Sequence, residues 1–175
     1  PEIGTMEYEG VKAQIVDMPS IGAEEFDSGI VNTADCLLIV IEKLDDLNKA
    51  GMLLERAIGK RIIVVDKADK LSDDELRKLQ ERVKARRLNA VIVSCMNGYG
   101  IDELKRRIFE SMDVIRVYTK EPHKAKSEVP IVLHKGSTVK DVAERILKGF
   151  SNKVKEARVT GPSGKFPNQK VGLRH

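Results

Sequence analysis

The chain has 175 residues, of which 41% are hydrophobic, and a net charge of +4. This length accommodates one large domain or two small ones. No apolar run approaches the roughly 18–20 residues that span a bilayer, and the N-terminus lacks a signal-peptide pattern. The two cysteines and three histidines show no disulfide or metal-ligand spacing. We therefore expect a cytoplasmic location, without a membrane partner.

The first hundred residues alternate between apolar runs and helical patterns. Residues 5–9 and 12–16 flank Glu9-Gly10 and predict a hairpin at the antiparallel edge of a sheet. Continuous apolar runs at residues 36–41, 62–65 and 90–93 are typical of strands buried on both faces of a parallel sheet.

Three helices are predicted from apolar residues at helical spacing. The residues that carry this spacing are Leu47, Leu54 and Ile58, then Leu76, Leu79 and Val83, then Ile101, Leu104 and Ile108. Ser72-Asp73-Asp74-Glu75 predicts a capping box at the start of the second helix. The order β-α-β-α-β-α predicts an α/β fold, with a doubly wound and mostly parallel sheet.

Charge and pattern both change near Val114. Residues 1–114 hold 17 basic against 22 acidic residues, a net charge of −5, whereas residues 115–175 hold 14 against 5, a net charge of +9. The second part reads β-β-α-β, with strands at 114–119, 129–134 and 157–160, and predicts one helix across a mixed sheet. Its charge favours a polyanionic partner. A small domain with many surface lysines is the alternative.

Asp66-Lys67-Ala68-Asp69 directly follows the predicted strand at 62–65. Guanine presents two donors on one edge, its ring N1–H and its amino group. A single carboxylate accepts both, and such a site rejects adenine, which lacks the matching donors. Asp69 is the predicted acceptor, and the stem of Lys67 is predicted to lie along the face of the base. An ordinary charged loop is the alternative interpretation.

Two further segments follow predicted strands, Asp17-Met18-Pro19-Ser20 and Ser94-Cys95-Met96. Together with residues 66–69 they resemble, in order and spacing, the third, fourth and fifth nucleotide-binding motifs of GTPases. In those proteins the Asp of the third motif holds Mg²⁺ and the following Gly N–H meets the γ-phosphate. The resemblance implies these roles for Asp17 and Ser20, and a backbone contact of Ser94, Cys95 and Met96 with the guanine carbonyl.

Each segment has a simpler interpretation. The first could be any strand that ends in a turn with Pro, and Cys95 could be a buried structural thiol, which is compatible with a backbone contact. The motifs also depart from the GTPase pattern, because Asp66 replaces Asn, Ser20 replaces Gly, and Ile21 stands where Gln often positions water.

Residues 3–19, and the segments 115–120, 132–139, 161–163 and 170–173, make the resemblance more specific. The chain resembles Obg-like GTPases of the DRG (developmentally regulated GTP-binding protein) branch with a C-terminal TGS domain. The resemblance implies a partial Ras-like P-loop GTPase domain at 1–113 and a β-grasp, ubiquitin-like TGS domain at 114–175 that lacks its last strand. It further implies GTP or GDP with Mg²⁺, help from K⁺ or a protein cofactor, and a link to the ribosome or structured RNA.

The phosphate loop and the switch threonine are not in this sequence, which begins at Pro1 rather than Met. We therefore expect a fragment or processed product that does not hydrolyse GTP by itself, since phosphate-loop amides supply most phosphate binding. The open hypotheses are an incomplete ribosome-associated GTPase, a decayed G domain that serves as scaffold for the TGS domain, and an unrelated α/β domain. The tentative RNA contacts are Lys135, Lys140, Lys148, Lys153, Lys155, Arg158, Lys165 and Lys170.

Overall fold

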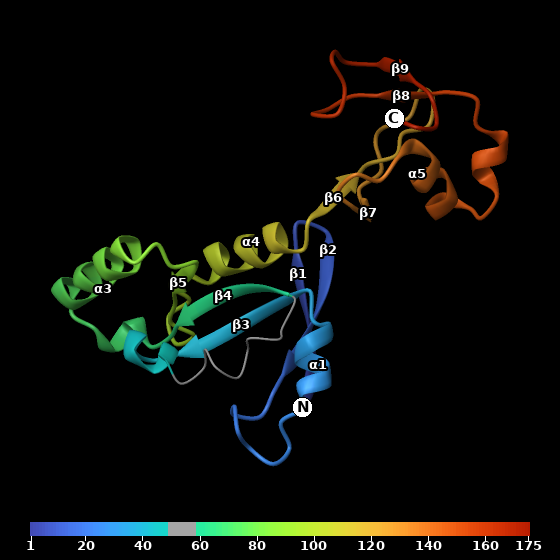
Figure 1. The fold of residues 1–175 in the computed structure, drawn as a ribbon. Coiled ribbons are helices and arrows are strands. Elements are labelled where there is room, and N and C mark those ends of the chain that lie inside the picture. Colours follow the sequence, from blue (N-terminus) through green and yellow to red (C-terminus); the bar gives the residue numbers. More distant parts are fainter. Residues whose placement is uncertain (49–58) are drawn as a thin grey trace. The chain divides into compact units, whose positions relative to one another are not determined.

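The computed structural model describes residues 1–48 and 59–175 (Figure 1). The predicted helix over Leu47, Leu54 and Ile58 lies mostly outside these residues. The chain divides into two compact units, one of residues 1–8 and 12–112 and the other of residues 9–11 and 113–175. None of the described helices is both long and apolar enough to cross a membrane.

The first unit is built on three parallel strands, β3 (Cys36–Ile41), β4 (Lys60–Val65) and β5 (Ala90–Ile92), in the order β3-β4-β5. Figure 1 shows β3 and β4 running side by side in the same direction. Their register pairs Ile41 with Val65 and Val65 with Ile92. The three strands therefore end at the same level, and the loops that follow them meet at one edge of the sheet.

Helices cover both faces of this sheet, α3 (Asp73–Ala85) and α4 (Ile101–Ser111). Strand side chains alternate between faces, so Val65 and Ile92 pack with Leu76 and Leu79 on the α3 face. Val64 and Val91 belong to the other cluster, which includes Ile108 of α4. The doubly wound α/β fold expected from the alternating pattern is confirmed.

The predicted capping box at Ser72 is also confirmed. The Ser72 N–H donates to Glu75 Oε2 at 2.9 Å, and the Glu75 N–H donates to Ser72 Oγ at 3.4 Å. Two backbone donors that no helical carbonyl can reach are thereby satisfied. Short 3₁₀ turns at Leu44–Asp46 and Ala68–Lys70 follow β3 and β4.

The predicted hairpin forms from β1 (Glu2–Tyr8) and β2 (Val11–Asp17). Its two turn residues, Glu9 and Gly10, have φ values of 47° and 78°, as a type I′ turn requires. The expectation that it forms an edge of the main sheet was wrong, because β1 and β2 make a two-stranded sheet of their own. Side chains hold it instead, with the Tyr8 ring 5.8 Å from that of Phe109 on α4.

A short helix, α1 (Ser28–Thr33), follows β2 and was not predicted. The Asp27 side chain accepts a hydrogen bond from Gly29 N–H at 2.7 Å and caps its start. Buried Val31 packs it against Leu37 and Ile39 of β3.

The second unit contains two antiparallel pairs rather than the predicted single mixed sheet. Strand β6 (Val114–Val117) pairs with β7 (Ile131–His134), and β8 (Ala157–Val159) pairs with β9 (Gln169–Val171). Among the described residues, the β6–β7 sheet and the β8–β9 sheet have two strands each. The pattern of apolar residues indicates where strands lie but not which strands pair.

One helix, α5 (Val139–Ile146), lies between the two pairs in sequence, and a 3₁₀ turn at Phe150–Lys153 follows it. Carbonyls near the C-terminus accept from its first turn: Val139 N–H donates to His175 at 2.9 Å and Lys140 N–H to Leu173 at 3.0 Å. The helix ends at Ile146, because Leu147 is the C-cap and 63% exposed, and Gly149 turns the chain with a φ of 81°.

The carboxylate of Glu103 on α4 should make the stability of the first unit depend on acid pH. Hydrogen bonds from Arg106 at 2.7 Å and Arg107 at 2.8 Å lower the pKa of Glu103 from 4.5 to about 2. A lowered pKa stabilises the fold above the unfolded-state value, and this contribution disappears as pH falls from about 4.5 towards 2. Exposure to solvent limits its size.

We expect Glu103→Gln to lower the free energy of unfolding near neutral pH and to have a smaller effect at about pH 3, where the wild-type carboxylate begins to protonate. Urea unfolding of both proteins at the two pH values measures this difference. A cost of the substitution that does not change with pH would contradict the assigned ion pairs.

Candidate functional site

The β4 loop, residues 66–69, begins directly where the sheet ends. Its first residue continues the ladder, since Asp66 N–H donates to the Ile41 carbonyl at 2.9 Å, and Ala68 N–H donates to the Val93 carbonyl at 3.0 Å. Between them Lys67 adopts the left-handed conformation, with a φ of 66° and a ψ of 35°. The reversal at Lys67 turns the chain across the carboxyl ends of the strands and brings Asp69 towards the β5 loop.

The β5 loop, residues 94–100, fixes the Asp69 carboxylate. Ser94 is fully buried, and its Oγ donates to Asp69 Oδ1 at 2.5 Å while accepting from the Met96 N–H at 3.2 Å. The hydrogen bond from Ser94 lowers the pKa of Asp69 below its usual value. Asp69 is therefore a charged and oriented acceptor at the sheet edge.

Further hydrogen bonds close the β5 loop on itself. Ser94 N–H donates to the Tyr99 carbonyl at 2.9 Å, and Gly98 N–H donates to the Ser94 carbonyl at 3.0 Å. Asn97 Oδ1 accepts from Tyr99 N–H at 3.0 Å. Cys95 is exposed, so the alternative of a buried structural thiol was wrong. Cys95 and Met96 are both exposed residues of this loop, and Met96 is 85% exposed.

Glu42, which directly follows β3, belongs to the same edge and was not identified from the sequence. Its carboxylate forms an ion pair with Lys67 Nζ. This contact lowers the pKa of Glu42 and raises that of Lys67. The sequence signal was available, because Glu42 occupies the position after its strand that Asp66 occupies after β4.

Asp66 carries an unusual polar atom. Its Oδ1 is buried and has no hydrogen-bond partner among residues 1–48 and 59–175. Burying a carboxylate oxygen without a donor costs free energy. An acceptor of this kind at the rim of the β4 loop is suited to a donor that a ligand or another segment supplies.

The residues of the third motif lie apart from these contacts. Asp17 ends β2, and the Ser20 carbonyl accepts from Ala23 N–H at 2.9 Å in the following turn. Both side chains are exposed, and in the described part of the chain no hydrogen bond or ion pair links them to the β4 or β5 loop. The described residues contain no cluster of three or more possible metal ligands. Asp17 could thus offer one carboxylate, which suits Mg²⁺ held mainly by water and phosphate.

The eight basic residues proposed to contact RNA are all exposed. Two of them, Arg158 and Lys170, are directly opposite each other in the β8–β9 pair. Alternation places their neighbours Ala157, Val159 and Val171 on the other, less exposed face of that pair. Lys170 also forms an ion pair with Glu156 at 2.9 Å. The β8–β9 pair therefore presents a basic outer face.

Part of the chain matches a known domain family. The TGS domain family matches residues 115–175. An uncharacterized GTP-binding protein of Methanocaldococcus jannaschii is 33% identical over 115 residues, which are 65% of this chain and 29% of that protein. GTP-binding protein 1 of Schizosaccharomyces pombe is 33% identical over 150 residues, which are 83% of this chain and 39% of that protein.

Developmentally-regulated GTP-binding protein 2 of Homo sapiens is 32% identical over 115 residues, covering 65% of this chain and 30% of that protein. The chain spans between 29% and 39% of the length of these three relatives. It is a DRG-like chain, related to the developmentally regulated GTP-binding proteins, with a TGS domain at residues 115–175.

Proposed function

We propose that this chain supplies the guanine-binding edge and the C-terminal domain of a cytoplasmic GTP-binding protein. The observation that supports this most directly is the 2.5 Å hydrogen bond from buried Ser94 to Asp69. It joins the loops after β4 and β5 and fixes a charged acceptor outside the carboxyl ends of parallel strands, where ligands bind in folds of this kind. The three named relatives are all GTP-binding proteins by name.

Each group at this edge has a distinct task in base recognition. Ser94 uses one lone pair of Asp69, which leaves the carboxylate free to accept from the N1–H and amino group of guanine. Adenine offers no matching donors, so it would leave the charge unpaired. Lys67 is proposed to cover the face of the base with its stem, and Glu42 holds its ammonium group. The backbone N–H of Cys95 is proposed to meet the guanine carbonyl, since the Met96 N–H already donates to Ser94 Oγ.

The phosphates need groups that these 175 residues do not include, because the sequence has no Gly-rich phosphate loop. We propose that Asp17 is a Mg²⁺ ligand and that the Ser20 N–H faces the γ-phosphate when the rest of the site is present. With Ile21 in place of a water-positioning Gln, hydrolysis would rely on K⁺ or a partner protein. This chain alone is proposed not to hydrolyse GTP.

Nucleotide titration of the full-length gene product, with Mg²⁺ and with either K⁺ or Na⁺, tests the proposal. We expect GTP to bind at least about a hundredfold more tightly than ATP, because ATP cannot satisfy Asp69. Turnover is expected to be faster with K⁺ than with Na⁺. Equal affinity for the two nucleotides would rule out Asp69 as the specificity residue.

The basic second unit is proposed to bind structured RNA, on the ribosome or elsewhere. The contacts proposed are the eight exposed cations named above, led by the Arg158 and Lys170 pair on the outer face of β8–β9. Cations of this type contact phosphates and release counterions, so the affinity should fall steeply with salt. The 175-residue chain carries all eight of these cations and is the protein used in the test.

We expect Arg158→Ala with Lys155→Ala to weaken binding to ribosomal RNA about tenfold at low salt and to flatten the salt dependence of the affinity. The matched control is Lys78→Ala, which removes an exposed cation from α3 of the first unit. Filter binding at several salt concentrations measures all three proteins. An affinity that does not change with salt would contradict a phosphate-directed contact.

A decayed nucleotide site that serves as a scaffold for the second unit is the alternative, favoured by Ser20 and Asp66. Nucleotide binding by the full-length protein distinguishes the two functions. If the full-length protein binds RNA but shows no affinity for GTP, the scaffold is the correct function.

A further inference from the structure

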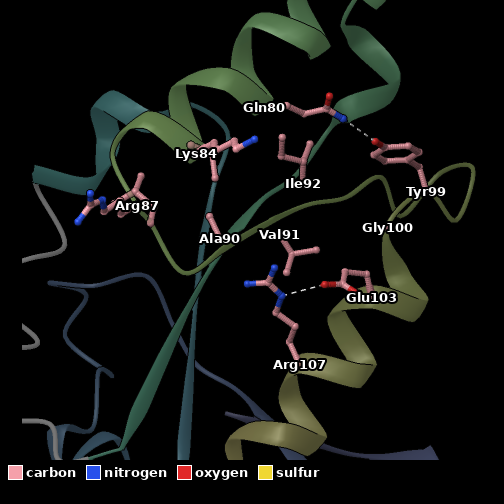
Figure 2. A pocket seen from close by; sticks show the side chains of 12 residues that line it. Gln80, Lys84, Arg87, Ala90, Val91, Ile92, Tyr99, Gly100, Glu103 and Arg107 are labelled. Carbon is pink, nitrogen blue, oxygen red and sulfur yellow. Dashed lines mark hydrogen bonds and ion pairs between the residues drawn. The ribbon is translucent and has the colours of Figure 1, made fainter.

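A groove lies along the outer edge of β5, on the opposite side of that strand from β4. It has a volume of about 700 Å³ and is lined by α3, the β5 loop and α4. Figure 2 shows Ala90, Val91 and Ile92 between the Gln80–Tyr99 contact and the Glu103–Arg107 contact. These two contacts measure 3.1 Å and 2.8 Å. The groove takes no part in the guanine-binding edge described above.

The floor of this groove is an unpaired strand edge. Hydrogen bonds from Ile63 N–H to Asn89 and from Val93 N–H to Val65 show which residues of the segment face β4. In a parallel ladder the facing residues alternate, so the main-chain groups of Ala90 and Ile92 point away from β4, and both residues line the groove. The Ile92 carbonyl lies close to Gly100. Among the described residues, the Ala90 carbonyl and the Ile92 N–H have no partner outside the sheet.

The N–H groups of Ala90 and Ser94, on either side, are already satisfied by the chain itself. Ala90 N–H donates to the Leu88 carbonyl at 2.9 Å, and Ser94 N–H donates to the Tyr99 carbonyl at 2.9 Å. Between them lie the Ala90 carbonyl, an acceptor, and the Ile92 N–H, a donor. In a parallel ladder a single residue of an added strand donates to such a carbonyl and accepts from such an N–H. The geometry therefore fits a short extended peptide rather than a compact molecule.

The walls of the groove are positively charged. Lys84, Arg87 and Arg107 line it with a single carboxylate, Glu103. Glu103 is held by Arg106 and Arg107, whereas Lys84 and Arg87 have no ion pair within residues 1–48 and 59–175. Apolar side chains of Val83, Leu88 and Ile92 lie between these charges. The positive charge of the walls and the strand edge of β5 together favour an extended acidic segment with apolar residues at alternate positions.

We propose that this groove binds an acidic, extended segment of a partner protein, which pairs in parallel with Ala90–Ile92. Two main-chain hydrogen bonds, apolar contacts at alternate positions and the two unpaired cations would stabilise the complex. The few contacts imply a modest affinity, with a dissociation constant on the order of 100 μM.

The test uses the isotope-labelled 175-residue chain and an acetylated, amidated peptide of alternating Glu and Val. We expect amide shifts in the NMR spectrum at Ala90–Ile92, together with slower hydrogen exchange of the Ile92 N–H. Lys84→Glu should weaken binding about tenfold. The matched control, Lys78→Glu, reverses an exposed charge on the same helix outside the groove and should leave the affinity unchanged.

Three results would overturn the proposal. The first is the absence of amide shifts at Ala90–Ile92 at millimolar peptide. The second is equal weakening by Lys84→Glu and Lys78→Glu, which would indicate only a general charge effect. The third is equal binding of free glutamate, which would indicate a site for small anions, or of the peptide with its alternate amides methylated, which would indicate binding without main-chain hydrogen bonds.

Discussion

Asp69→Asn is expected to exchange guanine for xanthine as the preferred base. Guanine presents two donors to this position, and the ionised carboxylate accepts both. Xanthine keeps the ring N–H but carries a carbonyl in place of the amino group, so it matches an amide with one acceptor and one donor. The substitution retains an oxygen for the bond from Ser94. We expect guanine affinity to fall about a hundredfold, or ~2.7 kcal/mol.

Titration of GDP and XDP into the full-length gene product measures both affinities. Ser94→Ala is the comparison variant, because it keeps the Asp69 carboxylate but removes the hydroxyl that orients it. It should weaken guanine binding about tenfold without a gain for xanthine. If Asp69→Asn lowers the affinity for both bases to the same extent, Asp69 supports the loop and does not read the base.

Gly100→Ala is expected to give the largest loss of stability in the first unit. Gly100 begins α4 from a left-handed conformation, with a φ of 72°. A Cβ at this residue would lie 2.1 Å from the Ile92 carbonyl oxygen and 3.2 Å from its carbonyl carbon, so it would meet backbone rather than a flexible side chain. We expect a cost of about 3–5 kcal/mol in the free energy of unfolding, measured by urea denaturation.

Gly98→Ala provides the matched control. Gly98 lies in the same loop with a φ of 78°, but a Cβ there would have no atom within 4 Å. Gly98→Ala should lower the free energy of unfolding by only about 1 kcal/mol, the cost of placing a side chain in the left-handed conformation. Equal costs for the two substitutions would show that conformation alone matters and that the close approach of Gly100 to β5 is relieved by relaxation.

Local patterns determined most of the first unit. The apolar runs at 36–41, 62–65 and 90–93 became β3, β4 and β5 with small changes at their ends. Ser72 capped α3 as predicted. These features depend on residues close in sequence, through side-chain alternation, helical spacing and capping, so no tertiary information was needed. Strand ends in a parallel sheet also indicated that the loops after β4 and β5 would meet, as the hydrogen bond from Ser94 to Asp69 shows.

Contacts between distant residues could be decided only by the tertiary structure. The bond between Ser94 and Asp69 spans 25 residues, and so does the pairing of Glu42 with Lys67. The pairing of β8 with β9, and the separation of β1–β2 from the main sheet, depend on which strands meet during folding. The sequence by itself determined most of the elements and predicted a type of site. The tertiary structure decided which charges are paired, which carboxylate is oriented, and that β5 has no second partner strand within residues 1–48 and 59–175. These features depend on distances that no local pattern encodes.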